Sequence, residues 1–269
     1  MADIKEWATR ALAAANKYPI PLMPQAQVEQ VVRSLRPIAP GMELIRLGPE
    51  GDGGYLVPDD LDGIGACFSP GVWKVSGFEY DCAERGMNVF LADNSVDAPA
   101  VAHARFVFTK KNVGAVTRAD FISLDDWVDA ALPHADGDLL LQMDIEGYEY
   151  ETLLGMSEQL LKRFRIMVIE FHQVDWVWSA AGFRYMAPTF QKILRHHTCV
   201  HLHPNNCCGV VTRGKLEIPR LMEFTFLRND RVRAKTFAKT FPHPLDRDNT
   251  GEGALPLPAC WYADARGTT

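Results

Sequence analysis

Acidic residues and a histidine follow two apolar segments in the middle of the chain. The segment LLLQM runs into Asp144 and Glu146, and the later segment RIMVIEFH carries Glu170 and His172 at its end. Carboxylates at the end of a buried strand are costly unless a cation or a hydrogen-bond donor meets them. We therefore predict Asp144, Glu170 and His172 as catalytic residues, and as ligands of Mg²⁺ or another divalent cation.

The neighbouring acidic residues Glu149 and Glu151 belong to the helical stretch that follows Gly147. Charged side chains in a helix usually belong to its solvated face, and we expect both side chains to be exposed.

A glycine-containing turn follows an earlier apolar segment. The string FSPGVWKVSGFE places Ser69 and Gly71 after the predicted strand and Gly77 before the next helix. A glycine turn at the carboxyl end of a strand lets a cofactor approach the backbone closely. The spacing differs from GxGxxG, so a pyrophosphate-containing dinucleotide is not expected, although an ordinary strand-to-helix turn remains possible.

A single carboxylate, Asp93, ends the next apolar segment in NVFLADNSVD. A carboxylate at this position can accept hydrogen bonds from both hydroxyls of a ribose, although it could also cap a helix. A cofactor with a ribose and no pyrophosphate is indicated, and the sulfonium and ammonium groups of S-adenosylmethionine would also meet the carboxylates near Asp144.

Two downstream segments hold further polar and aromatic side chains. The string HLHPNN carries His201, His203, Asn205 and Asn206, which could bind a sugar, complete a metal shell, or form a strand and an Asn-rich turn. The aromatic run from Trp176 to Tyr185 could form a stacking wall for a sugar ring, or belong to the core.

These residues need elements that bring them to one edge of a sheet. Short apolar segments alternate with amphipathic stretches, which predicts β-α-β units around a mostly parallel sheet. The predicted strands are 65–68, 88–92, 105–108, 139–143 and 165–171. A helix near 189–196 and the strand-like CVHLH, GVV and MEFTFL follow, and this late group predicts an antiparallel edge.

The two ends of the chain differ from this central pattern. Helical spacing of Ile4, Trp7, Ala8 and Leu12, and again of residues 28–35, predicts a helical extension over residues 1–40 and a main domain over 41–269. These helices are expected to pack on the domain or on a second subunit, which allows a homo-oligomer. The Pro-rich residues 241–258 are expected to form an extended strap over the surface.

Composition limits the partners. A net charge of −6 and a pI near 5.8 argue against a general nucleic-acid or anionic-membrane surface. No signal peptide or apolar membrane span is apparent, and the six cysteines lack the spacing of a disulfide framework. The adjacent Cys207 and Cys208 are expected to make a poor ordinary disulfide, structural zinc is disfavoured, and a reducing cytoplasm is the expected location.

The chain resembles the FkbM-type methyltransferase family. The matching strings occur in the family's order over about residues 44–249, and MDIEG followed by a helix and VIEFH is the most specific part. They are GDGGYLVPDDL, SPGVWKVSGFE, LADNSVD, ISLDDWV, MDIEGYEYETLLGM, VIEFH, HPNN and FPHPLDRDN.

The resemblance implies a Rossmann-like class I methyltransferase fold of the α/β class and S-adenosylmethionine as methyl donor. It also implies O-methylation of a hydroxyl on a sugar, glycan or related natural product, and a divalent cation in some members. The residues it places around the cofactor are Asp52, Gly53, Tyr55, Ser69, Gly71, Asp93, Asn94, Ser95, Asp144 and Glu146.

Other classes of function remain open. An NAD-linked oxidoreductase or epimerase is disfavoured by the missing GxGxxG. A non-catalytic binding module of methyltransferase-like fold, or a metal-dependent hydrolase using the same carboxylates, is the alternative to a methyltransferase.

Overall fold

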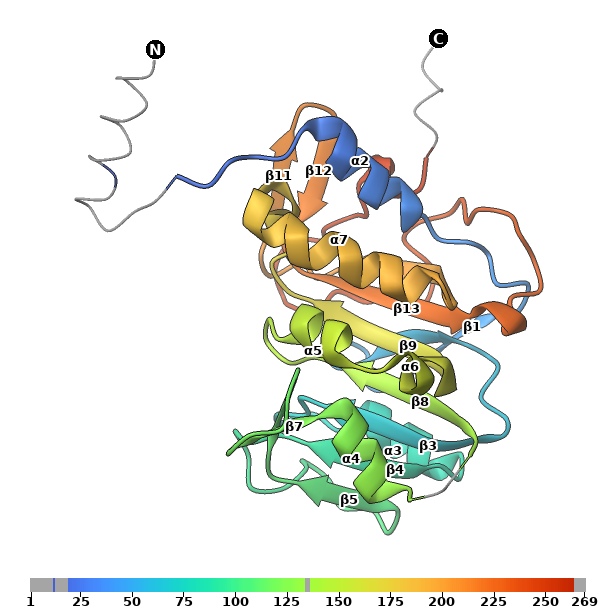
Figure 1. Ribbon diagram of the computed structural model, residues 1–269. Helices are drawn as coiled ribbons and strands as arrows, with labels where there is room; N and C mark the ends of the chain where they lie inside the picture. The colour runs from blue at the N-terminus through green and yellow to red at the C-terminus, as the bar shows by residue number, and fades with distance from the viewer. Residues whose placement is uncertain (1–11, 13–18, 134–135, 264–269) are drawn as a thin grey trace.

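A seven-stranded sheet forms the centre of the protein in a computed structural model, which describes residues 12, 19–133 and 136–263 (Figure 1). Its strand order is β10-β13-β9-β8-β3-β4-β5. The strands are β3 (Ile64–Pro70), β4 (Asn88–Ala92), β5 (Phe106–Thr109), β8 (Asp138–Met143), β9 (Phe164–Phe171), β10 (His197–Pro204) and β13 (Met222–Arg228). The five strands predicted in the first part of the sheet are all present, with ends shifted by at most two residues.

The pairing of the strands confirms the predicted α/β class and mostly parallel sheet. Strands β3, β4, β5, β8 and β9 pair in parallel, whereas β13 pairs antiparallel with both β9 and β10. The one strand of this sheet that runs antiparallel to the others is therefore β13, which lies between β9 and the edge strand β10. The GVV segment does not join this sheet, because it starts a separate hairpin of β11 (Val210–Arg213) and β12 (Leu216–Pro219).

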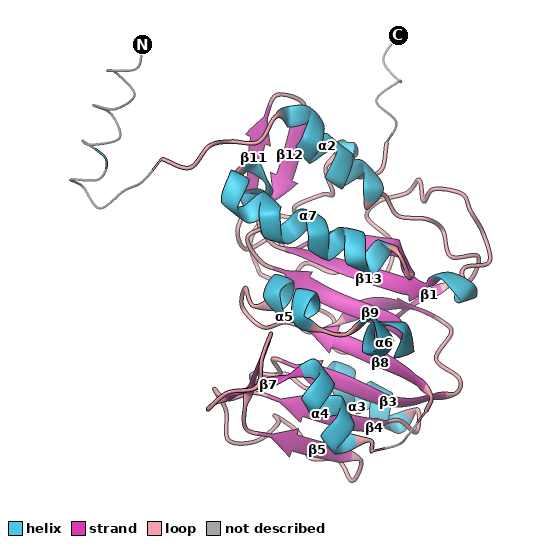
Figure 2. Cartoon of the chain, viewed as in Figure 1, coloured by secondary structure: helices cyan, strands magenta, loops and turns pink. Residues whose placement is uncertain are grey.

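Helices cover both faces of the sheet, and Figure 2 shows the main group on the near face. The described helices are α2 (Gln25–Ser34), α3 (Gly77–Glu84), α4 (Leu124–Ala131), α5 (Glu149–Gly155), α6 (Glu158–Arg163) and α7 (Ala180–Leu194), with short 3₁₀ turns η1 (Val174–Trp178), η2 (Asn229–Arg231) and η3 (Ala259–Trp261). The helix predicted near 189–196 is thus the last part of a longer helix, which begins where Ser179 caps Gly182 N–H.

Side chains of the sheet alternate between two hydrophobic clusters. Phe68 belongs to a cluster on one face that includes residues of α2, α4 and α7, whereas Cys67 belongs to a cluster on the other face that includes residues of α3 and the β1–β2 hairpin. All eight residues of β9 are buried, as expected for a parallel strand covered on both sides. Apolar runs without alternation therefore mark the centre of this sheet.

Smaller elements complete the chain. The hairpin of β1 (Leu44–Leu47) and β2 (Tyr55–Pro58) packs against β9 and β13, and β6 (Asn112–Gly114) pairs in parallel with β7 (Phe121–Ser123). The N-terminal run from Ile4 lies outside the described residues except for Leu12, whereas the run at 28–35 forms most of α2.

No helix in the described residues is long and apolar enough to cross a membrane. The C-terminal segment 241–258 contains no helix or strand and contacts the rest of the molecule through hydrogen bonds of Asp246, Asn249 and Thr250. The expectation of an extended strap is confirmed.

Candidate active site

A cavity of about 700 Å³ opens where the central strands end. Gly71, Asp93, Asp144 and His172 each directly follow, in turn, β3, β4, β8 and β9, and all four line this cavity. Parallel strands place their carboxyl ends at one edge of a sheet, which is why these residues from distant parts of the sequence meet. Asn205 follows the edge strand β10 and lies at the same edge.

Gly71 allows a close approach of two strand ends. Its φ is +85°, and a Cβ atom added there would lie 1.5 Å from the carbonyl oxygen of Asp144. Gly71 N–H donates to Ala92 O, and Asp144 N–H donates to Pro70 O, so the turn bridges three strands. Only glycine fits this conformation and this space.

Ser69 lies beneath that turn and does not line the cavity. It is fully buried, with its Oγ 2.5 Å from Glu79 Oε1 and 2.6 Å from Gln142 Oε1. Burial raises the pKa of Glu79 to about 7, although the Ser69 hydroxyl opposes this shift. The sequence resemblance placed Ser69 against the cofactor, whereas the structure gives it a supporting place below Gly71.

Asp93 already accepts hydrogen bonds from the protein. Its Oδ2 accepts from Trp73 N–H, and its Oδ1 accepts from the backbone N–H and the hydroxyl of Ser95. Asp93 and Ser95 line the cavity, whereas Asn94 is not among the lining residues. A carboxylate has about four lone-pair sites, so Asp93 keeps capacity for a further donor, and rotation of the Ser95 hydroxyl would free another.

The segment after β1 reaches the same region. Asp52 lines the main cavity and also a smaller adjoining pocket, which Gly53 and Tyr55 line together with Gly71 and Asp144. Tyr55 is buried, and burial raises its pKa well above the ordinary value. The predicted placement of residues 52–55 against this end of the cavity agrees with this geometry.

Glu149 is fully buried, so the expectation of a solvated side chain is wrong for this residue. Its Oε1 accepts from Ile145 N–H and Gly147 N–H and lies 3.1 Å from His172 Nδ1. Glu149 therefore closes the loop between β8 and α5 and also fixes the imidazole. The signal in the sequence was its position at the first turn of a helix, where a carboxylate can satisfy free N–H groups. Glu151 is exposed, as predicted.

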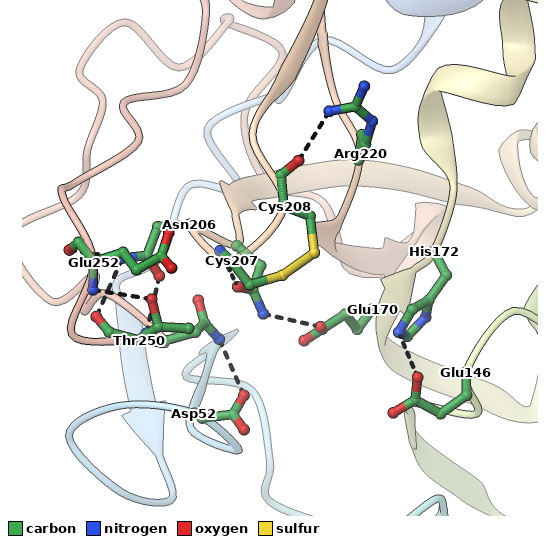
Figure 3. Close-up of a disulfide and its surroundings, with 12 residues drawn as sticks. Asp52, Glu146, Glu170, His172, Asn206, Cys207, Cys208, Arg220, Thr250 and Glu252 are labelled. Carbon is green, nitrogen blue, oxygen red and sulfur yellow. Dashed lines mark hydrogen bonds and ion pairs between the residues drawn. A yellow bond between two sulfur atoms is a disulfide. The ribbon is translucent and has the colours of Figure 1, made fainter.

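The other ring nitrogen of His172 faces the cavity acids. Nε2 lies 3.4 Å from Glu146 Oε2 and 3.9 Å from Asp144 Oδ1, as Figure 3 shows for Glu146. Because Glu149 accepts at Nδ1, the neutral ring carries its hydrogen there and keeps its lone pair on Nε2. His172 is thus arranged to accept a proton, or to bind a cation, on the cavity side.

Electrostatics at this cluster raise the pKa of both Asp144 and His172. Burial raises the pKa of Asp144 to about 7; Glu146 and Glu149 add to this shift, and His172 opposes it. Burial lowers the pKa of His172, but the hydrogen bond to Glu149 and the surrounding carboxylates outweigh burial and raise it overall. The two groups are close enough to titrate as a pair.

The carboxylates of Asp144 and Glu149 and the ring of His172 also form a group whose ligand atoms all lie within 4.8 Å of one another. Asp144 Oδ1 is buried and has no hydrogen-bond partner among the described residues, so it is available to bind a cation or a hydrogen-bond donor. Glu170, predicted as a ligand, is not in this group.

Glu170 has a different hydrogen-bond partner from His172. Its Oε1 accepts from Asn205 Nδ2 at 3.1 Å. Its Oε2 is buried and has no hydrogen-bond partner in the part of the chain that the structure describes. Burial and the neighbouring Asp144 and Glu223 carboxylates raise its pKa well above the ordinary value. Glu170 thus offers an unsatisfied polar atom to whatever fills this part of the cavity.

Three of the four polar residues singled out in HLHPNN contact the C-terminal strap and do not line the cavity. His201 and His203 lie near Asp246 of the strap, with His201 Nε2 at 2.8 Å from Asp246 Oδ1. Asn206 donates to Thr250 O and Glu252 O. Only Asn205 of these lines the cavity.

The aromatic run from Trp176 to Tyr185, which could have formed a stacking wall or part of the core, does not line this cavity. Trp176 and Tyr185 themselves are exposed. The aromatic lining of the cavity is instead Trp73, Phe121 and Tyr148, with Phe121 and Tyr148 ring centroids 5.5 Å apart. Sequence reasoning missed these residues because they come from three separate segments of the chain.

The adjacent cysteines also correct an expectation. Cys207 and Cys208 are joined in a disulfide, and both line the cavity. Of the three cysteines from Cys199 to Cys208, only the buried Cys199 therefore has a free thiol, so this segment does not offer two free thiols to a zinc ion.

A family model matches part of the chain. Residues 81–196 match the model of the methyltransferase FkbM domain, the family that the sequence strings resemble. No curated protein sequence matches the chain.

Two solved structures are remotely similar. One, described as a methyltransferase from an antibiotic biosynthesis pathway of Anabaena variabilis ATCC 29413, has 12% identity and a TM-score of 0.27, over 52% of this chain and 58% of that one. The other, EvdMO1, has 10% identity and a TM-score of 0.32, over 76% of this chain and 47% of that one. The chain thus spans about half the length of these two proteins.

Proposed function

We propose that this protein is an S-adenosylmethionine-dependent O-methyltransferase acting on a hydroxyl of a sugar, glycan or related natural product. The observation that carries the proposal is the buried Glu149 carboxylate holding His172, with Nε2 facing a cavity that begins at the Gly71 turn. The match of residues 81–196 to methyltransferase domains supports the same reaction class.

We assign one end of the cavity to the cofactor because of the residues that line it. Asp93 and Ser95 offer acceptors to a ribose, Phe121 and Tyr148 offer flat apolar surface, and Asp52 and Asp144 offer negative charge to cationic groups. These residues suit S-adenosylmethionine, which when bound there supplies the methyl group.

The acceptor end contains Glu170, Asn205 and Thr250. These are short polar groups suited to hydroxyls, which is why a sugar or another polyol fits better than an apolar acceptor. Their role is to hold one hydroxyl in line with the methyl group, because orientation supplies much of the rate of such transfers.

His172 removes the proton from that hydroxyl. In the neutral ring, Nδ1–H donates to Glu149 and Nε2 accepts the proton, after which the carboxylates of Glu149, Glu146 and Asp144 stabilise the imidazolium. This arrangement places the positive charge among negative groups.

A divalent cation is the alternative use of the same atoms. Asp144 Oδ1 and His172 Nε2 would hold it, with Glu149 orienting the ring from behind, and it would lower the pKa of a bound hydroxyl. Nε2 has one lone pair, so it cannot bind a cation and accept a proton at the same time. The sequence prediction of Asp144, Glu170 and His172 as ligands is therefore narrowed to Asp144 and His172.

Calorimetric titration of the chelator-treated protein with S-adenosylhomocysteine, with and without Mg²⁺ and with NAD as control, tests the cofactor assignment. Micromolar binding of S-adenosylhomocysteine with none of NAD is expected. No binding in either metal condition would overturn the proposal and favour a hydrolase or a non-catalytic module.

Methyl transfer from labelled S-adenosylmethionine to a panel of free and nucleotide-linked hexoses tests the acceptor class. Asp144→Asn should lower turnover at least tenfold, and full turnover with unchanged cofactor binding would contradict its role. A cytoplasmic location is proposed from the sequence, and fractionation of the native host would test it.

A further inference from the structure

The Cys207–Cys208 disulfide lies at the acceptor end of the cavity. The two residues come shortly after β10 and line the cavity with Glu170, Asn205 and Thr250 (Figure 3). Both residues are exposed, so small thiols and disulfides in solution can reach the sulfur atoms.

The other cysteines differ in exposure. Cys67, Cys82 and Cys199 are buried, and Cys260 is partly buried. Burial raises the pKa of the Cys67, Cys199 and Cys260 thiols, which keeps them in the unreactive protonated form. Cys207 and Cys208 are therefore the cysteines that we expect to react with thiols and disulfides in solution.

A short chain of hydrogen bonds links the pair to Glu170. Cys207 N–H donates to Asn205 Oδ1 at 3.0 Å, and Asn205 Nδ2 donates to Glu170 Oε1 at 3.1 Å. The disulfide closes a small ring that includes the peptide bond between the two cysteines, so it holds the backbone that positions this N–H. Opening the ring frees the Cys207 backbone and weakens the support of Asn205.

Hydrogen bonds on either side of the cysteine pair limit the structural change on reduction to this turn. Asn206 is tied to the strap through Thr250 and Glu252, and Arg220 Nη1 donates to Cys208 O. Reduction thus loosens a segment that is anchored at both ends, rather than the sheet.

We propose that Cys207 and Cys208 form a reversible redox switch that controls the acceptor end of the cavity. The oxidised pair holds Asn205 and Glu170 in place for the acceptor, and the reduced pair releases them. The effect on acceptor binding rests on the proposed methyl transfer, whereas the redox cycle itself does not. In a reducing cytoplasm, disulfides of this kind are usually transient and act in sensing or catalysis.

The chemistry is thiol–disulfide exchange with a low-molecular-weight disulfide of the glutathione type. The thiolate of one cysteine attacks a sulfur of that disulfide and releases one thiolate, and the second cysteine then attacks the mixed disulfide and releases the other. The protein loses two electrons and two protons, and the external disulfide gains them. A dithiol reverses the reaction.

Equilibration of the full chain at a series of ratios of reduced to oxidised glutathione, followed by acid quenching, alkylation and peptide mass spectrometry, tests the cycle. Cys207 and Cys208 should change together in one two-electron transition, while Cys67, Cys82 and Cys199 stay reduced. A pair that is never oxidised, or never reduced by dithiothreitol, overturns the proposal.

Amide hydrogen exchange measured in the oxidised and reduced protein tests the structural link. Exchange at residues 205–209 is expected to be about tenfold faster after reduction, because the turn loses its ring. Cys207→Ser/Cys208→Ser should match the reduced protein, and Cys260→Ser, outside the cavity, should match the oxidised one. Equal exchange in both states overturns the link.

Ligand titration separates this proposal from the proposed function. S-adenosylhomocysteine is expected to bind the oxidised and reduced forms within about twofold, because its end of the cavity lies away from the pair. Turnover of an accepted hexose should fall at least fivefold on reduction. Absence of S-adenosylhomocysteine binding in both states contradicts the proposed function and leaves the redox cycle and the exchange difference standing.

Discussion

Glu149 Oε1 lies 3.1 Å from His172 Nδ1, and the same oxygen accepts hydrogen bonds from two backbone N–H groups. The carboxylate is therefore held by the loop after β8 while it holds the imidazole at the end of β9. The two strand ends are joined through one buried side chain.

Glu149→Gln is expected to lower turnover about 10²–10⁴-fold, because an amide can donate to Nδ1 and move the ring hydrogen to Nε2. Affinity for S-adenosylhomocysteine should change by no more than about twofold. Glu151→Gln, on the exposed side of the same helix, is the matched control and should keep full turnover. Full turnover of Glu149→Gln would show that Glu149 is not needed to position the His172 ring.

The rate of methyl transfer should depend on pH through His172. The ring accepts a proton only when neutral, and its pKa is raised above 6.5, so kcat/KM should rise with pH with an inflection above 6.5. The inflection belongs to the cluster rather than to His172 alone. Glu149→Gln should move the inflection of its residual activity to lower pH, and an inflection below 6.5 in the wild type would contradict the assignment.

Gly71→Ala is expected to lower the melting temperature more than Gly86→Ala. Both glycines have positive φ, which costs a side chain about 1–2 kcal/mol, but a Cβ at Gly86 meets no atom within 4 Å and one at Gly71 meets Asp144 O. Thermal unfolding of both variants measures the difference. Equal losses would show that the close approach of the strand ends is unimportant.

His197 should make the protein less stable in acid. It is buried with Nε2 at 2.7 Å from Phe164 O, and burial lowers its pKa to about 4. The unfolded chain binds a proton near pH 6.5 and the folded one only near 4, so the free energy of unfolding falls as the pH drops between these values.

Between pH 7.5 and pH 5 this group should account for about 2 kcal/mol of lost stability. Urea unfolding at both pH values measures the loss, and His197→Gln, which cannot titrate, should lose about 2 kcal/mol less than the wild type over the same interval. An equal loss in the two proteins would show that His197 titrates normally.

The fold could be predicted from the sequence because its signal is local. Strands such as β8 and β9 are mostly apolar runs, and the polar residues that follow them reach the same cavity by the geometry of a parallel sheet. Gly71, Asp93, Asp144 and His172 were found this way.

Other site residues depend on tertiary packing. From the sequence alone Glu149 is expected at the surface, but in the structure it contacts His172 at the end of the next strand. Ser69 is expected to line the cavity, but its hydroxyl instead bonds to Glu79 of α3 beneath the turn. Position relative to a strand end predicts proximity to a site, but it does not predict which face a side chain takes.

The strap has a consequence for synthesis. Asn249 donates to Asp52 and Glu223, and Thr250 bonds to Asn206, so the wall of the cavity near Glu170 is completed by some of the last residues described. A ribosome delivers the chain from its N-terminus, and domains begin to fold as they emerge. The sheet can therefore assemble on the nascent chain while the cavity is still open on one side. A nascent chain that has not reached residue 241 already contains Asp144, Glu146 and Glu149, but it lacks the residues that complete the cavity wall.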